Sequence, residues 1–135
     1  MRILIILSLL LVCASAQAAD LSVHLSGIES PRGNIRVSVY ASEAAYKTSA
    51  ASAKLSIPAD GHPLAVFKGL SAGQYAVIAY QDLNLNAKLD RADNGMPLEP
   101  YGFSQNPSSR FGQPPFSATV VPVGTEDSSI EIMLE

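Results

Sequence analysis

Cysteine is almost absent from this sequence: of its 135 residues only Cys13 carries a thiol, and Cys13 lies in an apolar run near the N-terminus. If that run is removed as a signal peptide, no cysteine remains. This excludes disulfides, thiol catalysis and cysteine-ligated metal sites. Histidine is equally scarce, since only His24 and His62 occur and they lack the spacing of metal ligands. No long amphipathic helix, phosphate-binding loop or dinucleotide-binding fingerprint occurs either.

Basic residues are also few. The chain has 9 Lys and Arg against 12 Asp and Glu, which gives a net charge of −3. Removing residues 1–18 removes one basic residue, Arg2, and leaves 8 basic against 12 acidic residues, a net charge near −4. This acidity argues against nucleic acid and against an anionic membrane as partners.

Residues 1–18 have the pattern of a secretory signal peptide. A short basic start precedes an apolar run over residues 3–14, and Ala16-Gln17-Ala18 is a small-x-small cleavage site. The run is too short for a comfortable membrane span, and no stop-transfer pattern follows it. We therefore expect a periplasmic or secreted protein with one mature domain over residues 19–135. A membrane anchor or lipidation at Cys13 would be the alternatives, but the bulky Val12 is unfavourable for lipoprotein cleavage.

Apolar and polar residues alternate with period two along most of the mature chain, which predicts half-buried strands. A short helix is expected over residues 43–51, because Ser42 is a suitable N-cap and Glu43 favours the first turn. About seven strands with Gly/Pro turns predict an all-β, antiparallel Greek-key β-sandwich with one long loop excursion. The predicted strands cover residues 21–25, 35–40, 53–57, 64–67, 75–80, 118–123 and 130–134.

One local pattern sharpens this fold prediction. Leu70, Gly73 and Tyr75 form a Leu-x-x-Gly-x-Tyr arrangement at the start of a predicted strand. This arrangement is typical of a tyrosine corner, in which the tyrosine hydroxyl bonds to backbone a few residues upstream. An ordinary buried tyrosine is the alternative.

Residues 82–116 interrupt the alternation. The segment holds five of the nine prolines, so little of it is expected to be central strand. It also holds three of the four phenylalanines, and this aromatic content argues against disorder. Long loops that are ordered are often functional.

Oxygen-bearing side chains recur at alternate positions at the start of this segment, in "DLNLNAKLDRAD". The spacing matches that of an EF-hand or dockerin-type calcium loop, whose ligands stand at positions one, three, five, seven, nine and twelve. Two departures weaken the match: Ala87 replaces the turn glycine, and an aspartate stands where a long bidentate glutamate is usual. The predicted Ca²⁺ ligands are Asp82, Asn84, Asn86, the Lys88 carbonyl, Asp90 and Asp93.

A strand with one polar face is the alternative for the same residues, although Asn and Asp are disfavoured in strands. A curled loop needs a counter-ion, because two carboxylates about 6 Å apart repel by roughly 3 kcal/mol at an effective dielectric of 20. Lys88 and Arg91 are candidates for that role if no metal binds. The sequence leaves both arrangements open.

The stretch "YGFSQNPSSRFGQPPF" is the second candidate site. Tyr101, Phe103, Arg110 and Phe111 are the predicted ligand-binding residues, as a stacking surface for a sugar or peptide. The alternative is that these aromatics cover an open end of the sandwich while Arg110 bonds loop carbonyls.

The sequence gives little support for catalysis, and we expect that the protein is not an enzyme. Ser104 lacks the second glycine of a nucleophile elbow. Asp93 and Glu99 are a candidate acid–base pair for a hydrolase, but any acidic loop offers as much. The leading hypothesis is an exported binding or structural module with a calcium-stabilised loop, whose partner is a glycan, a protein or a cell-envelope component. A metal-free accessory domain is the runner-up.

Several stretches together resemble a bacterial family called domain of unknown function 2141. They are "LSVHLSGIESPRGNIRVSVYAS", "GLSAGQYAVIAYQDLNLNAKLD", "GMPLEPYGFSQN" and "RFGQPPFSATV". The likeness covers essentially the whole mature chain. More distantly, the Gly-x-Tyr strand resembles carboxypeptidase-regulatory and transthyretin-like sandwiches. The resemblance implies an exported β-sandwich of uncharacterised role, and supplies no substrate and no catalytic residue.

Overall fold

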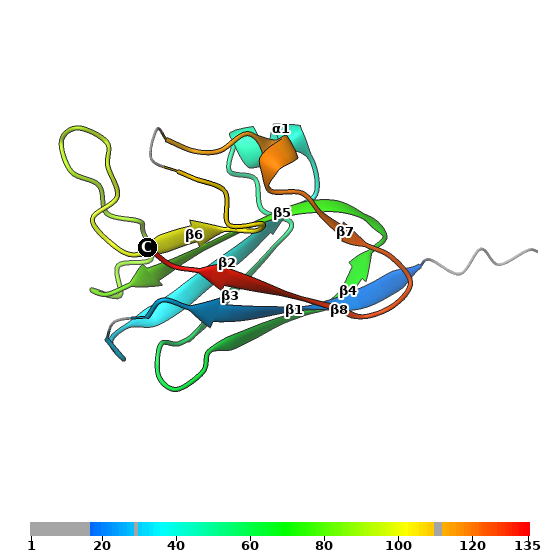
Figure 1. Ribbon diagram of the computed structural model, residues 1–135, viewed down its shortest axis with the longest axis horizontal. Helices are drawn as coiled ribbons and strands as arrows, with labels where there is room; N and C mark the ends of the chain where they lie inside the picture. The colour runs from blue at the N-terminus through cyan, green and yellow to red at the C-terminus, as the bar shows by residue number, and fades with distance from the viewer. Residues whose placement is uncertain (1–16, 29, 110–111) are drawn as a thin grey trace, which may run out of the picture.

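The computed structural model describes residues 17–28, 30–109 and 112–135, whose elements are almost entirely β-strands (Figure 1). The elements are β1 (Ala18–Ser26), β2 (Asn34–Tyr40), α1 (Glu43–Lys47), β3 (Ala53–Pro58), β4 (Leu64–Ser71), β5 (Gly73–Asp82), β6 (Tyr101–Phe103), the 3-10 helix η1 (Phe116–Ala118), β7 (Val121–Val123) and β8 (Ser128–Met133).

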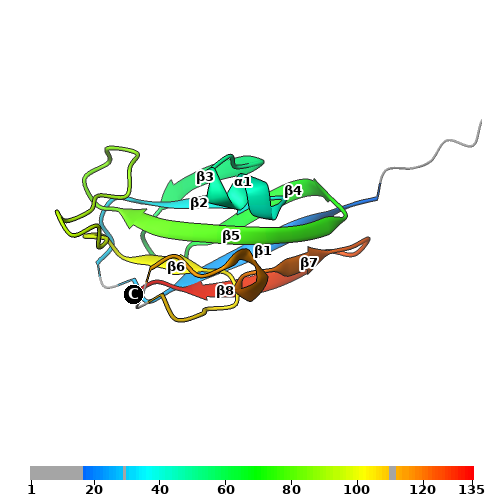
Figure 2. The ribbon, with the colours of Figure 1, turned by 90° about the horizontal axis from the view of Figure 1, so that it is seen from above.

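The strands form two sheets that pack as the layers of a sandwich (Figure 2). The three-stranded sheet has the order β4-β1-β8, and the five-stranded sheet has the order β3-β2-β5-β6 with β7 also paired to β5. The predicted all-β sandwich is confirmed. Its pairing is antiparallel except that β8 runs parallel to β1, from Leu21↔Ser128 to Ser26↔Met133.

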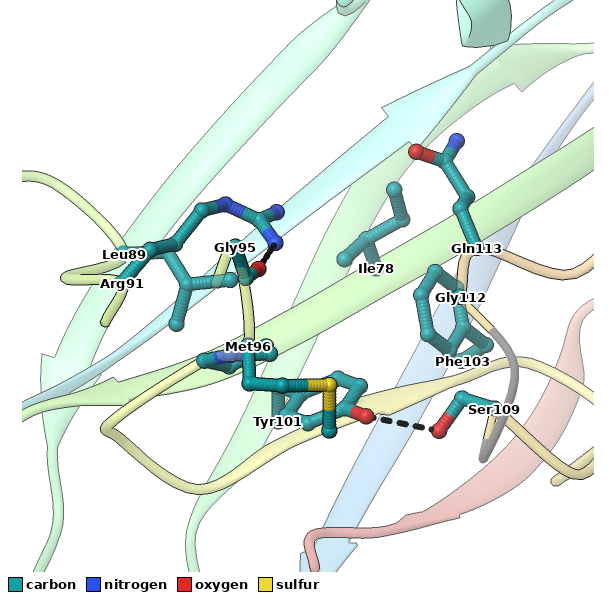
Figure 3. A pocket seen from close by; sticks show the side chains of 11 residues that line it. Ile78, Leu89, Arg91, Gly95, Met96, Tyr101, Phe103, Ser109, Gly112 and Gln113 are labelled. Atoms are coloured by element: carbon teal, nitrogen blue, oxygen red, sulfur yellow. Dashed lines mark hydrogen bonds between the residues drawn. The ribbon is translucent and has the colours of Figure 1, made fainter. Parts of the chain in front are cut away.

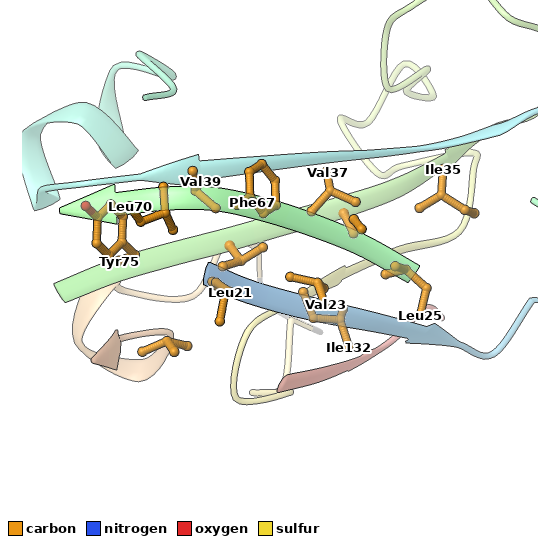
Figure 4. Close-up of a cluster of buried hydrophobic side chains, with 14 of the residues drawn as sticks. Leu21, Val23, Leu25, Ile35, Val37, Val39, Phe67, Leu70, Tyr75 and Ile132 are labelled. Carbon is orange, nitrogen blue, oxygen red and sulfur yellow. The ribbon is translucent and has the colours of Figure 1, made fainter. Parts of the chain in front are cut away.

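The core lies between the two sheets, where the inward-facing residues of each strand meet (Figure 4). Period-two alternation explains this placement, since every second side chain of a strand points to the same face. Burying these side chains is the main stabilising contribution, at about 25 cal/mol per Å² of apolar surface. The members of this core with no exposed surface are Leu21, Val23, Ile35, Val37, Val39, Val77, Ala79 and Ile132.

A second, smaller hydrophobic cluster covers part of the outer face of the five-stranded sheet. Its buried members are Tyr40, Tyr46, Ala76 and Phe103, with Phe116 packed against them. Tyr46 lies edge-on to Tyr40, with ring centroids 5.9 Å apart, and its hydroxyl donates to the Pro114 carbonyl at 2.7 Å. The proline-rich segment that interrupts the alternation is thus fastened back onto the sheet through α1.

The tyrosine corner is confirmed. The Tyr75 hydroxyl donates to the Ser71 carbonyl at 2.7 Å, and the ring is buried. The predicted N-cap is also confirmed, because Ala45 N–H donates to Ser42 Oγ at 3.1 Å. The predicted helix was too long, however. It ends at Lys47, where the Thr48 hydroxyl bonds the Ala44 carbonyl and Ser49 adopts a positive φ of 56°.

In the second half of the chain one predicted strand was too long and one strand was not predicted. Residues 116–118 form η1, and the strand expected over 118–123 is limited to β7. Pro122 within β7 is tolerated because this short strand pairs only with β5. Conversely, β6 lies in the segment expected to be loop. The run Tyr101–Phe103 contains no proline itself and pairs with Ile78–Tyr80.

The predicted signal peptide lies almost wholly outside the described residues, so export and cleavage stay predictions. In the described part of the chain, no helix has the length and hydrophobicity of a membrane span.

Ser104 links the segment after β6 to β5 and to the residue after η1, and replacing it tests the fold. Its Oγ accepts the Val77 N–H at 2.9 Å and donates to the Thr119 carbonyl at 2.5 Å, with no exposed surface. We predict that Ser104→Ala lowers the free energy of unfolding by about 2–4 kcal/mol, because two buried backbone groups lose their partner. Urea denaturation measures this. Ser108→Ala is the control, since Ser108 is exposed in the same segment; an equal effect of the two substitutions would contradict the bridging role.

Candidate functional site

Asp82 stands at the end of β5, where the loop excursion begins. Alternation along β5 directs its side chain to the outer face of the sheet, and the side chain has no exposed surface. Arg36 Nε, from the neighbouring β2, donates to Asp82 Oδ2 at 2.8 Å. Two backbone N–H groups of the loop also donate to this carboxylate: Asn86 to Oδ1 at 3.2 Å and Ala87 to Oδ2 at 2.8 Å. One buried charge therefore holds both a strand and the first turn of the loop.

These contacts determine the protonation of Asp82. Burial is the largest single influence and raises the pKa, but the hydrogen bonds from the Arg36 side chain, Ala87 and Asn86 lower it. The charge of Arg36 lowers it further, and the net pKa lies below the ordinary value of 3.8. The carboxylate is therefore ionised and paired at neutral pH.

The polar side chains that follow Asp82 at alternate positions converge on Asp90. Asn84 Nδ2 donates to Asp90 Oδ2 at 2.6 Å, and Asn86 Nδ2 donates to Asp90 Oδ1 at 2.7 Å. The amide oxygens cap the turns, since Asn84 Oδ1 accepts Asn86 N–H at 3.3 Å and Asn86 Oδ1 accepts Lys88 N–H at 3.0 Å. The segment is thus a curled loop, and the alternative of a strand with one polar face was wrong.

The curl needs residues in the left-handed region, and the sequence supplies no glycine there. Leu85 and Ala87 have φ of 59° and 63°. Ala87 occupies the position at which calcium loops carry their turn glycine. Its positive φ is the conformation that a turn glycine adopts, at a cost of order 1 kcal/mol for a residue with a Cβ.

Glu99 closes the far end of the loop. Its Oε2 accepts the Leu83 N–H at 2.7 Å and its Oε1 accepts the Asp90 N–H at 3.0 Å, and only 6% of the residue is exposed. Both oxygens are occupied by backbone groups of the loop. The sequence suggested Glu99 only as half of an acid–base pair with Asp93, which is exposed. Glu99 instead acts as a clamp between the two ends of the loop.

The other predicted loop residues lie further out. The Lys88 side chain is exposed, and Arg91 donates to the Gly95 carbonyl at 3.0 Å. Neither forms an ion pair with a described residue; Arg36 is the cation that pairs with the loop. Within the described ranges, no three His, Cys, Asp or Glu residues lie close enough to form a metal site by themselves. A cation at this loop would have to use amide and carbonyl oxygens as well.

The closed loop forms one wall of a pocket of about 190 Å³ (Figure 3). Leu89, Met96 and Pro97 line it from the loop, and Tyr101 and Phe103 line it from β6. In Figure 3 Met96 is drawn in front of Tyr101, and Gln113 lies on the other side of the lining residues. Apolar walls with a few polar groups at the rim are typical of small-ligand sites.

The predicted aromatic residues divide into three groups. Tyr101 is half-buried and lines the pocket, with its hydroxyl held by a hydrogen bond from Ser109 Oγ at 2.9 Å. Phe103 lines the same pocket but is mostly buried in the second cluster, edge-on to Tyr101. Arg110 and Phe111 lie outside the described residues. Part of the aromatic segment therefore covers the sheet, while Tyr101 and Phe103 also line the apolar pocket.

Comparison with known proteins agrees with the motifs. Residues 23–131 match the family described as "Uncharacterized protein conserved in bacteria (DUF2141)". The chain belongs to this family. No curated protein matches the chain, and no solved structure does. The resemblance inferred from the motifs is thereby confirmed for the DUF2141 family, while the more distant likeness to transthyretin-like sandwiches stays a prediction.

The buried Asp82 makes the stability of this DUF2141 domain depend on pH. Because its folded pKa is lowered, the stabilisation by its charge is present above about pH 4 and is lost as the pH falls through the folded pKa. We predict that Asp82→Asn lowers the free energy of unfolding by about 2 kcal/mol at pH 7, since Arg36 and the loop N–H groups lose a charged partner. The difference from wild type should shrink below about pH 4.

Urea denaturation at pH 7 and at decreasing acidic pH measures both effects. Asp60→Asn is the control, since Asp60 is exposed in a turn and its replacement should stay within about 0.5 kcal/mol of wild type. A destabilisation by Asp82→Asn that stays constant down to acidic pH would show that the charge is not what matters.

Proposed function

We propose that this protein is an exported, non-catalytic binding module whose loop 82–99 is ordered by calcium and whose pocket receives an apolar group of a ligand. One observation carries the proposal. The loop that bears the oxygen-rich pattern is the same loop that forms a wall of the pocket. Anything that fixes the loop therefore fixes the pocket.

The donor set supports calcium as the ordering ion. Asn84, Asn86 and Asp90 offer only oxygen as metal ligand, the donor that Ca²⁺ prefers, and their side chains already converge. Rotating the terminal amide group of Asn84 or Asn86 by half a turn exchanges the positions of its nitrogen and oxygen atoms with little change of shape. Each amide oxygen could then face a cation. A bound cation would thus replace the two amide N–H groups that donate to Asp90 here. With few carboxylates, the affinity should be modest, with Kd of about 0.1–1 mM.

The pocket supports an apolar or aromatic group as the bound moiety. Its walls are the side chains of Leu89, Met96, Tyr101 and Phe103, and Arg91 and Gln113 lie among the lining residues as polar partners. We propose that the group belongs to a glycan, a protein or another cell-envelope component.

A metal-free structural domain is the second candidate, and a specific observation favours it. Asp82, Asp90 and Glu99 each already accept hydrogen bonds from loop groups, and Asp82 has Arg36 as counter-ion. Such a network keeps the loop closed without an ion, because buried carboxylates are stable once paired and hydrogen-bonded.

A melting curve with and without calcium distinguishes the two candidates. At about ten times Kd, roughly 10 mM calcium, binding to the folded state adds about 1.4 kcal/mol and raises Tm by roughly 5 °C over the value in EDTA. Asp90→Asn should lose this shift, because it removes the charge from the convergence point while leaving Arg36 and Asp82 paired. Asp60→Asn should keep it. An unchanged wild-type Tm would favour the metal-free domain.

The pocket can be tested with indole as an apolar probe. We predict that indole shifts the backbone amide NMR signals of Ile78, Met96 and Phe103, which line the pocket, and that Met96→Asp weakens the binding about 10-fold by placing a charge on the apolar wall. Met133→Asp is the control, since Met133 is an exposed apolar residue on β8 outside this pocket. Equal weakening by both substitutions would contradict the site.

A further inference from the structure

A second hollow lies on the outer face of the five-stranded sheet, beside the second cluster, and its lining combines hydroxyl groups and two cationic side chains with apolar side chains such as Leu55. It measures about 410 Å³ and is lined by Arg36, Ser38, Tyr40, Lys54, Ser56 and Tyr80, among others. Of the described residues, no acidic one lines it. Because Arg36 is paired with the buried Asp82, Lys54 supplies the positive charge of this groove that no described acidic residue pairs with.

The strand register explains why these side chains share a face. Ser56, Arg36 and Tyr80 lie in one row across β3, β2 and β5, because Arg36 pairs with Ser56 on one side and Tyr80 on the other. Lys54 and Ser38 form the next row. The intervening residues point into the core, so alternation directs this polar set outward. We call the six polar and aromatic lining residues named above the outer groove.

Arg36 is oriented for a ligand by a group that the ligand would not touch. Its Nε is used by Asp82, whose carboxylate is fully buried, while 30% of the Arg36 side chain stays exposed. No hydrogen bond to a described residue uses its two Nη groups. A guanidinium anchored at Nε and open at Nη presents parallel N–H donors, the arrangement that recognises a carboxylate in a bidentate manner.

The rest of the outer groove offers hydroxyl groups and an aromatic ring. Ser38, Ser56 and Tyr80 supply hydroxyls that take no part in the hydrogen bonds among described side chains, and Lys54 is exposed with no ion pair within the described ranges. Tyr80 is half-buried at the floor. Cations beside hydroxyls and a ring suit a ligand that carries both a carboxylate and several hydroxyls.

We propose that the outer groove binds a carboxylate-bearing saccharide, with the sugar carboxylate at Arg36 and Lys54 and the sugar hydroxyls at the serines and Tyr80. This goes beyond the proposed function, because the outer groove is separate from the apolar pocket and needs no calcium. The two regions meet at Asp82, which orients Arg36 and holds the loop, and at Ala87, which forms part of the groove wall.

Galacturonic acid is the probe, titrated into the purified protein at low salt and followed by backbone amide NMR. We expect shifts at Ser38, Ser56 and Tyr80, and binding at least about 10-fold tighter than that of neutral galactose, which lacks the carboxylate. Lys54→Gln should weaken the binding about 5-fold without loss of Tm, because Lys54 is exposed on an edge strand. Lys68→Gln, on the other sheet, should change nothing.

A further titration, with oligogalacturonate, identifies the source of the ligand. Oligogalacturonate that binds more tightly than the monomer would indicate an acidic polysaccharide as the source, and equal affinity would indicate a free sugar acid.

Three results would overturn the proposal: no shifts in the outer groove with either probe, equal binding of galactose, or binding of sulfate as tight as that of galacturonate, which would show a site for any anion. Absence of a calcium-dependent Tm shift would sink only the metal part of the proposed function, and absence of indole binding only its pocket.

Discussion

The structure around the candidate site depends on one buried carboxylate. Asp82 carries a full charge with no exposed surface, and such a group is tolerated only if it is paired and hydrogen-bonded. The chain meets this requirement by placing Arg36 on the neighbouring strand and by curling the loop so that two N–H groups face the same oxygens. The loop wall of the apolar pocket and the orientation of Arg36 in the outer groove both follow from that single requirement.

The five-stranded sheet serves two purposes with its two faces. Its inner face is apolar and closes the main core, as in any sandwich. Its outer face is divided: one part lies beneath the aromatic cluster formed by α1 and the proline-rich segment, and the other is polar and open. The candidate site and the outer groove both lie on this outer side, where packing constrains the side chains less. The side chains of the inner face, in contrast, stabilise the fold by packing in the core.

Much of the fold could be predicted from the sequence, because period-two alternation reports directly which face of a strand is buried. The curled loop around Asn84, Asn86 and Asp90 was one of the two arrangements that the local spacing left open, and the hydrogen bonds to Asp90 decide between them. What could not be predicted came from distant residues. Arg36 lies 46 positions before Asp82, and no local pattern marks it as the partner. Glu99 acts through backbone N–H groups, which leave no trace in a sequence, and β6 was missed because prolines flank it.

The parallel pairing of β1 with β8 has a consequence for how the chain acquires its structure. These strands are the first and the last of the described strands, and Asp20 N–H donates to Asp127 Oδ1 across 107 positions. Closing so large a span costs chain entropy before any contact compensates for it, and topologies rich in distant contacts fold slowly. The smaller layer cannot be completed until β8 has left the ribosome, so in the nascent chain β1 and β4 lack the third strand of their sheet.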